Sequence, residues 1–151
     1  MINVCVSTDL FDTGAEIAEL GRDGMGAVAS FTGIVRGGND EAGGGLTALT
    51  LEHYPAMTEA ALRALAEEAT ARWPLGGVTL HHRIGRLVPG DPVVLVACAS
   101  AHRKDALEAC AFLIDRLKTD APFWKRESFA DGREVWVEAR DSDDAAAARW
   151  D

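Results

Sequence analysis

The run PVVLVACA at residues 92–99 constrains the fold more than any other stretch of this chain. Nearly every residue in it is apolar, and it lacks the alternation of polar and apolar side chains that marks a half-exposed strand. We therefore predict that this run forms a strand in the centre of a sheet.

A helical pattern follows the apolar run. Ser100 is suited to cap a helix from about residue 102 to residue 118, and Pro122 prevents its continuation. Apolar side chains recur along this segment at helical spacing: Ala106, Cys110, Leu113 and Leu117.

A second long helix is expected after Pro55, which ends the preceding strand. Its predicted core-facing stripe consists of apolar residues spaced four apart: Met57, Ala61, Leu65, Ala69 and Trp73. Pro74 and the pair Gly76-Gly77 are predicted to terminate it.

The remaining patterns are shorter. Strands are predicted at residues 2–6, 26–35, 46–53, 78–84, 123–129 and 134–138. Short helices are predicted at residues 13–21 and after the acidic run that begins at Asp141. Strands interrupted by two long helices, with hairpin turns between many of them, indicate an α+β fold with a largely antiparallel sheet.

The segment 37–45, GGNDEAGGG, is interpreted as a flexible loop because its glycines retain backbone entropy that ordering would remove. We take it as a mobile flap and not as a linker between domains. With 151 residues in total, residues 1–151 are expected to form one domain.

The net charge of -9 and the isoelectric point near 4.8 argue against a broad basic face of the kind that binds nucleic acid or an anionic membrane. Any anion site must therefore be local. The start of the chain lacks a signal-peptide pattern and no apolar run approaches a membrane span, so a soluble, cytoplasmic protein is expected. Its three cysteines lie far apart in apolar runs and are interpreted as buried thiols.

Cations gather beside aromatic rings in the stretch LKTDAPFWKRE at residues 117–127. Lys118 falls at a helix end, where capping alone could account for it. Lys125 and Arg126 are neighbours on a strand and should point to opposite faces, so only one of them can share a pocket with Lys118. A lysine held among cations and partly desolvated is a better nucleophile or base, because its ammonium form is disfavoured.

His102 and Arg103 stand at the start of the helix predicted at 102–118, the end where a cation is disfavoured by the helix dipole. Cations there make sense if a phosphate or carboxylate binds, although an ordinary surface arginine is the alternative. No serine-hydrolase, zinc-protease or P-loop motif competes with this cationic site. The adjacent His81 and His82 should face opposite sides of a strand, so no metal site and no cofactor are predicted.

Taken together, the motifs resemble the large catalytic subunit of molybdopterin synthase, in family order from about residue 26 to residue 140. The matching segments are FTGIVR (31–36), LTLEHYPAMT (49–58), HRIG (82–85), PGD (89–91), SAHR (100–103), LKT (117–119), APFWKRE (121–127) and WVEAR (136–140). Each segment is weak alone, but their combination is specific.

The resemblance implies an α/β-hammerhead fold and a sulfurtransferase that forms the dithiolene of molybdopterin from cyclic pyranopterin monophosphate. It implies that the sulfur arrives as a C-terminal Gly-Gly thiocarboxylate on a small ubiquitin-like subunit. It further implies a homodimer of large subunits within a heterotetramer, in which a pocket can draw on both large subunits.

Carried over by motif, the resemblance makes Lys118 the principal catalytic lysine, with Lys125 as the second. The implied substrate-binding set is Ile34, Val35, Arg36, His102, Arg103, Lys118, Lys125, Arg126, Glu127 and Arg140. The chain departs from the family in the 37–45 loop and at Ile34, where many members have a polar residue. A non-catalytic module that binds a nucleotide or pterin phosphate is the alternative, and lysines at both motif positions argue against it.

Overall fold

The predicted apolar run lies near the centre of a four-stranded sheet, which is the larger of two sheets by the length of its strands. The computed structural model describes residues 1–37, 39–40, 44–137 and 141–151. The sheet has the order β1-β5-β7-β2, with β1 parallel to β5 and the other pairs antiparallel. Its strands are β1 (Ile2–Ser7), β5 (Leu75–Arg83), β7 (Pro92–Ser100) and β2 (Ala27–Ile34). Seven consecutive residues of β7 are buried, which confirms the prediction of a central strand.

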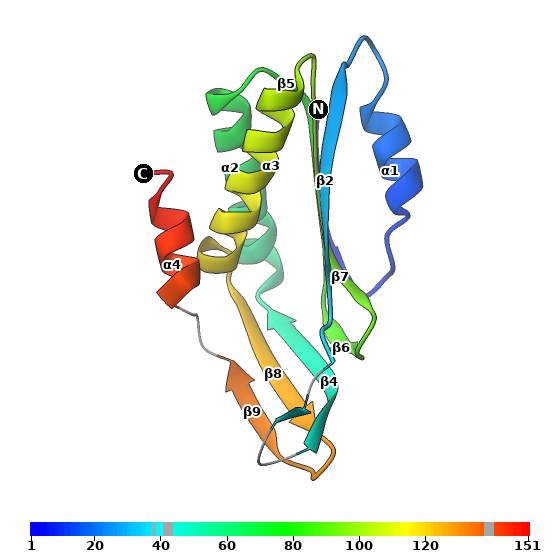
Figure 1. The fold of residues 1–151 in the computed structure, drawn as a ribbon, viewed down its shortest axis with the longest axis vertical. Helices are drawn as coiled ribbons and strands as arrows, with labels where there is room; N and C mark the ends of the chain where they lie inside the picture. The colour runs from blue at the N-terminus through cyan, green and yellow to red at the C-terminus, as the bar shows by residue number, and fades with distance from the viewer. Residues whose placement is uncertain (38, 41–43, 138–140) are drawn as a thin grey trace.

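Helices cover both faces of this sheet (Figure 1). The helices described are α1 (Thr13–Leu20), α2 (Pro55–Arg72), α3 (Arg103–Asp120) and α4 (Asp141–Ala148). On one face α2 packs against β1 and β5, and α3 packs against β2 and β7, while α1 lies on the opposite face. The two long predicted helices and the mixed α+β class are confirmed.

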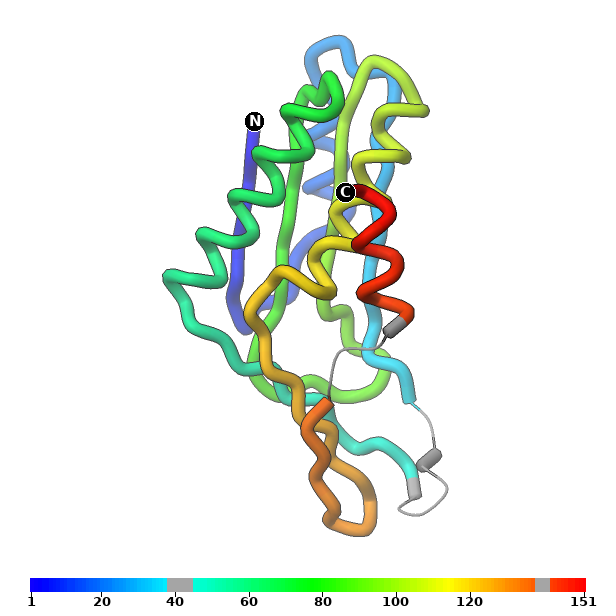
Figure 2. The backbone as a smooth tube through the Cα atoms, turned by 90° about the vertical axis from the view of Figure 1, so that its left-hand side faces the viewer, coloured from blue at the N-terminus to red at the C-terminus, as the bar shows by residue number. Residues whose placement is uncertain are grey.

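A second, antiparallel sheet has five strands, most of them shorter, and is called the small sheet below. It extends beyond one end of the four-stranded sheet, below the C-terminal end of α3 in Figures 1 and 2. It has the order β3-β4-β8-β9, and β6 also pairs with β4. Its strands are β3 (Asn39–Asp40), β4 (Gly44–His53), β6 (Gly85–Leu87), β8 (Phe123–Phe129) and β9 (Glu134–Val137). The strands predicted at 123–129 and 134–138 correspond to β8 and β9, which pair as an antiparallel hairpin, and residue 138 lies outside the described residues.

Two segments predicted as connections take part in this sheet. Asn39 pairs with Gly45 and Asp40 with Gly44, so the prediction of a loop over all of residues 37–45 was wrong at these positions. Residues 38 and 41–43 lie outside the described residues, and the flap's mobility stays a prediction. Leu87 lies in the connection between the strands predicted at 78–84 and 92–99, but it pairs with Leu49 as part of β6 and is 2% exposed.

The predicted stripe of α3 is confirmed, because Ala106, Cys110, Leu113 and Leu117 are all buried. The cap was assigned to the wrong residue. Ser100 ends β7, and its hydroxyl donates to the carbonyl of Pro74 at 2.9 Å. His102 occupies the N-cap position and makes no side-chain capping hydrogen bond.

The predicted stripe of α2 was wrong at its first residue. Met57 is 61% exposed, and the buried positions are Thr58, Leu62, Leu65, Ala66 and Ala69. Residues spaced four apart advance about 40° around a helix at each step, so a stripe of five such residues drifts by about 160°. It therefore cannot stay on one face of α2.

Gly76 and Gly77 lie inside β5 and do not form the predicted helix terminator. A Cβ atom on Gly76 would collide with the Met25 sulfur, and one on Gly77 would lie 2.6 Å from Leu20 Cδ2. These glycines therefore allow α1 and the segment after it to pack closely on the sheet. Nothing in the local pattern distinguishes this use of a Gly-Gly pair from a turn.

No helix among the described residues has both the length and the apolar character needed to cross a lipid bilayer. The larger core cluster lies between the sheet and the α2–α3 layer, and it contains Val78, Leu80, Val96 and Cys98 from the sheet with Leu62 and Phe112 from the helices.

We predict that Gly26→Ala destabilises the protein by roughly 2 kcal/mol or more, because its Cβ would collide with the backbone oxygen of Ala101. Gly14→Ala in α1 is the control, since its Cβ would have only Asp12 Oδ1 nearby, at 3.6 Å. That variant should be neutral or more stable by up to about 1 kcal/mol. Chemical denaturation measures both, and equal stabilities would contradict the packing described here.

Candidate functional site

Lys118 lies in the last turn of α3, where the sequence placed it. Its side chain is 50% exposed, and its Nζ is 3.8 Å from Oδ1 of Asp143 in α4. A two-residue connection then leads into β8, which carries Lys125. The two lysines thus flank one short turn at the junction between α3 and the small sheet.

Lys125 and Arg126 point to opposite faces of β8, as predicted. The Arg126 guanidinium lies 5.7 Å from the centre of the Trp136 ring and forms an ion pair with Glu134 at 3.8 Å. These contacts place Arg126 on the outer face of the small sheet, together with the 41% exposed Trp124. Lys125 shares the other face of β8 with Phe123.

His82 lies against that inner face, a position that sequence reasoning did not connect with the site. Its ring stacks on Phe123 with 3.9 Å between ring centres, and the residue is 4% exposed. Nδ1 is 2.8 Å from the carbonyl oxygen of Arg83, so Nδ1 carries the hydrogen and donates it. The HRIG motif contains His82, but only the folded arrangement shows that it lies under Phe123.

Burial lowers the pKa of His82 from its ordinary 6.5 to about 4. The hydrogen bond to Arg83 opposes this shift, and the positive charges of Lys125 and His53 add to it. His82 is therefore a neutral imidazole at pH 7. His81, its neighbour, faces α1 instead, where Nε2 lies 3.6 Å from Glu16.

The end of β2 brings an exposed arginine toward the small sheet. Arg36 is exposed and Ile34 is 58% exposed, whereas Val35 is 3% exposed and packs with Leu51 and Leu87. The Val35 backbone N–H donates to Asp91 at 2.8 Å, and its carbonyl accepts from the N–H of Gly90 at 2.9 Å. Val35 therefore fixes the backbone that presents Arg36.

His102 and Arg103 are exposed at the opposite end of α3 from Lys118. A helix rises about 1.5 Å per residue, so Arg103 and Lys118 are about 22 Å apart along the helix axis. Figure 1 shows the first turn of α3 at the far end of the molecule from the small sheet. One chain therefore does not bring these predicted site residues together.

Two of the predicted positions give less information. Glu127 is half-buried on β8, on the same face as Lys125. Arg140 lies outside the described residues. Among the described residues, no cluster of three or more His, Cys, Asp or Glu side chains is placed to hold a metal ion.

Cys98 and Cys110 are buried, as the sequence predicts, and Cys5 is half-buried. Burial raises the pKa of Cys110 to about 11, and it raises the pKa of Cys98 further, with a smaller contribution from Cys110. Both are therefore protonated thiols at neutral pH, and the thiolate is the reactive form of cysteine. Neither is suited to accept or donate sulfur.

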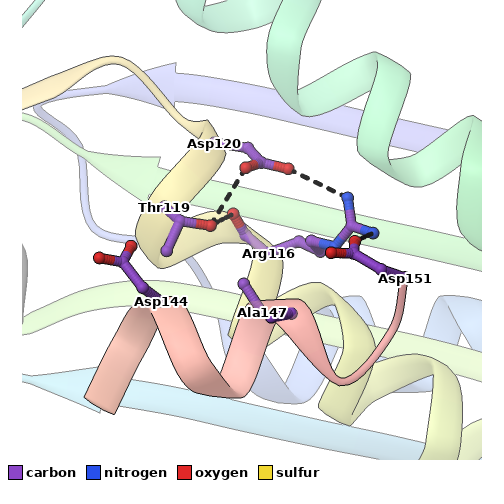
Figure 3. Close-up of a pocket in the computed structure, with 7 residues that line it drawn as sticks. Arg116, Thr119, Asp120, Asp144, Ala147 and Asp151 are labelled. Carbon is purple, nitrogen blue, oxygen red and sulfur yellow. Dashed lines mark hydrogen bonds and ion pairs between the residues drawn. The ribbon is translucent and has the colours of Figure 1, made fainter. Parts of the chain in front are cut away.

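A cavity of about 250 Å³ lies between α3 and α4 (Figure 3). Its lining carries three aspartates and one arginine and consists of Arg116, Thr119, Asp120, Asp144, Ala147, Ala148 and Asp151. The Arg116 guanidinium is already paired with Asp120 at 3.4 Å and Asp151 at 3.0 Å. This cavity does not suit an anionic ligand.

Comparison with known families identifies the chain. The family model described as "MoaE protein" matches residues 6–120, which include α3, β7 and Lys118. The chain belongs to the MoaE family. This confirms the resemblance drawn from the motifs, because the curated MoaE relatives are molybdopterin synthase catalytic subunits.

The MoaE relatives match nearly the whole chain. The molybdopterin synthase catalytic subunit of Escherichia coli is 54% identical over 148 residues, covering 97% of each chain. That of Pseudomonas aeruginosa is 54% identical over 145 residues and 93% of each chain. The molybdopterin cofactor biosynthesis protein E of Burkholderia multivorans has a solved structure with 51% identity and a TM-score of 0.83, covering 99% of this chain and 97% of its own.

We predict that His82 makes stability depend on pH. The unfolded state takes up a proton near pH 6.5 and the folded state only near pH 4, so this contribution is complete above pH 6.5 and is lost as pH falls toward 4. The loss between pH 7 and pH 5 should be about 2 kcal/mol. Urea denaturation at both pH values should show it in the wild type and in His81→Phe, but not in His82→Phe. An equal loss in both variants would contradict the assignment.

Proposed function

We propose that this protein is the catalytic subunit of a molybdopterin synthase. It transfers two sulfurs to cyclic pyranopterin monophosphate and so forms the dithiolene of molybdopterin. The observation that carries this proposal is the 54% identity with the Escherichia coli catalytic subunit, which extends over 97% of both chains. The cations at the junction of α3 and β8 support it, since both reactants would be anions.

The sulfur comes from a partner and not from a cysteine of this chain. Cys98 and Cys110 are buried, protonated thiols, so a persulfide on either would require the core to open. A small ubiquitin-like subunit with a C-terminal Gly-Gly thiocarboxylate delivers the sulfur. Each transfer breaks the bond between the acyl carbon of the tail and sulfur and forms a bond between that sulfur and a side-chain carbon of the substrate, which gives up an oxygen substituent. Water supplies the oxygen that leaves the tail as a carboxylate.

Lys118 is the principal catalytic lysine in this proposal. It is half-exposed at a helix end, so an extended tail can approach its ammonium group from solvent. An ammonium group there pairs with the thiocarboxylate and holds a proton beside the transferring sulfur. Lys125 is less exposed and stands beside neutral His82, which adds no further positive charge to the site at pH 7.

Arg36, His102 and Arg103 bind the phosphate and pterin of the substrate, with Arg126, Glu127 and Arg140 completing the pocket. The first turn of α3 adds backbone N–H donors beside His102 and Arg103. Because this turn lies about 22 Å from Lys118 in one chain, the site is shared. The α3 N-terminus of a second copy completes the site that contains Lys118, in a homodimer with one small subunit at each end.

We predict that Lys118→Ala lowers sulfur transfer by at least about a hundredfold, the typical value of a positioned acid or base. Its fold should remain, because the half-exposed pair with Asp143 adds at most about 1 kcal/mol. The assay mixes the protein with thiocarboxylated small subunit and cyclic pyranopterin monophosphate and measures molybdopterin. Arg63→Ala, which removes a cation from an exposed position of α2, is the control. Near-normal turnover by folded Lys118→Ala would contradict the assignment of Lys118 as the principal catalytic lysine.

We also predict that two variants with impaired activity, Lys118→Ala and Arg103→Ala, regain activity when they are combined in one dimer. In a mixed dimer of Lys118→Ala and Arg103→Ala, a shared site combines Lys118 and Arg103 from different copies, so one of the two sites carries both changes and the other carries neither. Unfolding and refolding the variants together should restore up to about a quarter of wild-type activity, since half of the dimers are mixed and each has one intact site. If the refolded mixture is no more active than the separate variants, each site is formed by residues of one chain alone, which would contradict the shared site.

A further inference from the structure

Helix α4 is held on α3 by contacts near its C-terminal end. The indole N–H of Trp150 donates to Asp115 at 2.8 Å, and the Arg149 guanidinium pairs with the same carboxylate at 2.8 Å. The Trp150 ring packs edge-on against Phe112 with 5.7 Å between ring centres, and Ala147 is buried. The position of α4 is therefore fixed by residues well away from its first turn.

This anchoring brings the acidic first turn of α4 beside the end of α3, and Figures 1 and 2 both show the two helices side by side. Asp143 is 25% exposed, and its Oδ1 is 3.8 Å from Lys118 Nζ. Asp144, the next residue, instead lines the cavity with Arg116 and Thr119. Two neighbouring carboxylates of one helix turn thus have different surroundings.

If Asp143 and Asp144 served only to stabilise the first turn of α4, they would be equivalent. Carboxylates in the first turn of a helix are favoured by the helix dipole, and this holds for Asp143 and Asp144 equally. Among the described residues, only Asp143 forms an ion pair with Lys118. The pair is partly exposed and its atoms are 3.8 Å apart, so it is weak enough to be replaced by another anion.

We propose that Asp143 is the resting counter-ion of Lys118, and that an anionic ligand reaches this lysine by displacing the Asp143 carboxylate. An aspartate side chain has the same charged group as a peptide C-terminus, so Asp143 occupies the position of the carrier's tail until the carrier arrives. Small free anions must compete with a carboxylate already in place. A tail attached to a folded carrier gains further contacts, and Asp143 therefore contributes to selection of the correct anion.

The proposal rests on the proposed function for the identity of the tail, but the contact can be tested without it. The chain has three lysines, Lys104, Lys118 and Lys125, so acylation of each is separable by mass spectrometry. Removing the carboxylate leaves the Lys118 amine without the ion-pair partner 3.8 Å away, so an acylating reagent reaches it more easily. Asp143→Asn should be acylated at Lys118 about two- to fivefold faster than the wild type, with Lys104 unchanged.

Asp144→Asn is the matched control, because it removes the same charge from the same turn without touching Lys118. It should be acylated at Lys118 at the wild-type rate. Equal rates in Asp143→Asn and the wild type, or equal acceleration in both variants, would overturn the proposal. Circular dichroism establishes that each variant is folded, and Asp143→Glu, which restores the charge, should return the rate toward that of the wild type.

Binding of a short peptide that ends in Gly-Gly supplies the second measurement. Asp143→Asn should bind the peptide with a free carboxylate about two- to fivefold more tightly than the wild type does, and should show no gain for the C-terminal amide. Failure of Asp143→Asn to gain affinity for the carboxylate peptide contradicts displacement. Acylation requires neither substrate nor small subunit, so a failed sulfur-transfer assay with accelerated acylation would overturn the proposed function alone.

Discussion

The burial of β7 is the constraint on which the rest of the structure depends. A strand with seven consecutive buried residues needs cover on both faces, and α3 covers one face of β7 while α1 covers the other. Helix α3 therefore packs lengthwise along the sheet, over β2 and β7. Arg103 in its first turn and Lys118 in its last turn are therefore held about 22 Å apart along the helix axis.

Local sequence patterns were sufficient to predict buried residues where these residues recur at the spacing of a single helix or strand. The burial of β7 and the buried stripe of α3 were predicted from the sequence because each depends only on residues within that element. The pairing of β6 and β3 with β4 could not be predicted, since each depends on the partner strand. Gly76 shows the same limit, because only the neighbouring Met25 explains why a glycine is needed within a strand.

The candidate site, too, was predictable from the sequence only in part. The opposite orientations of Lys125 and Arg126 follow from strand geometry and were predictable. The stacking of His82 on Phe123 joins the end of β5 to β8, and the ion pair of Lys118 joins α3 to α4, so neither could be read from a local motif. The motif resemblance grouped Arg103 with Lys118 by function, whereas the fold places them at opposite ends of α3 within one chain.

The central claim is that one site contains Lys118 of one copy and Arg103 of another. The most direct measurement is a crystal structure of the assembled protein with cyclic pyranopterin monophosphate bound. The account predicts one bound substrate with Lys118 from one chain and Arg103 from its partner within hydrogen-bonding or ion-pairing distance. A substrate held by residues of one chain alone, with the partner's α3 N-terminus elsewhere, would contradict it.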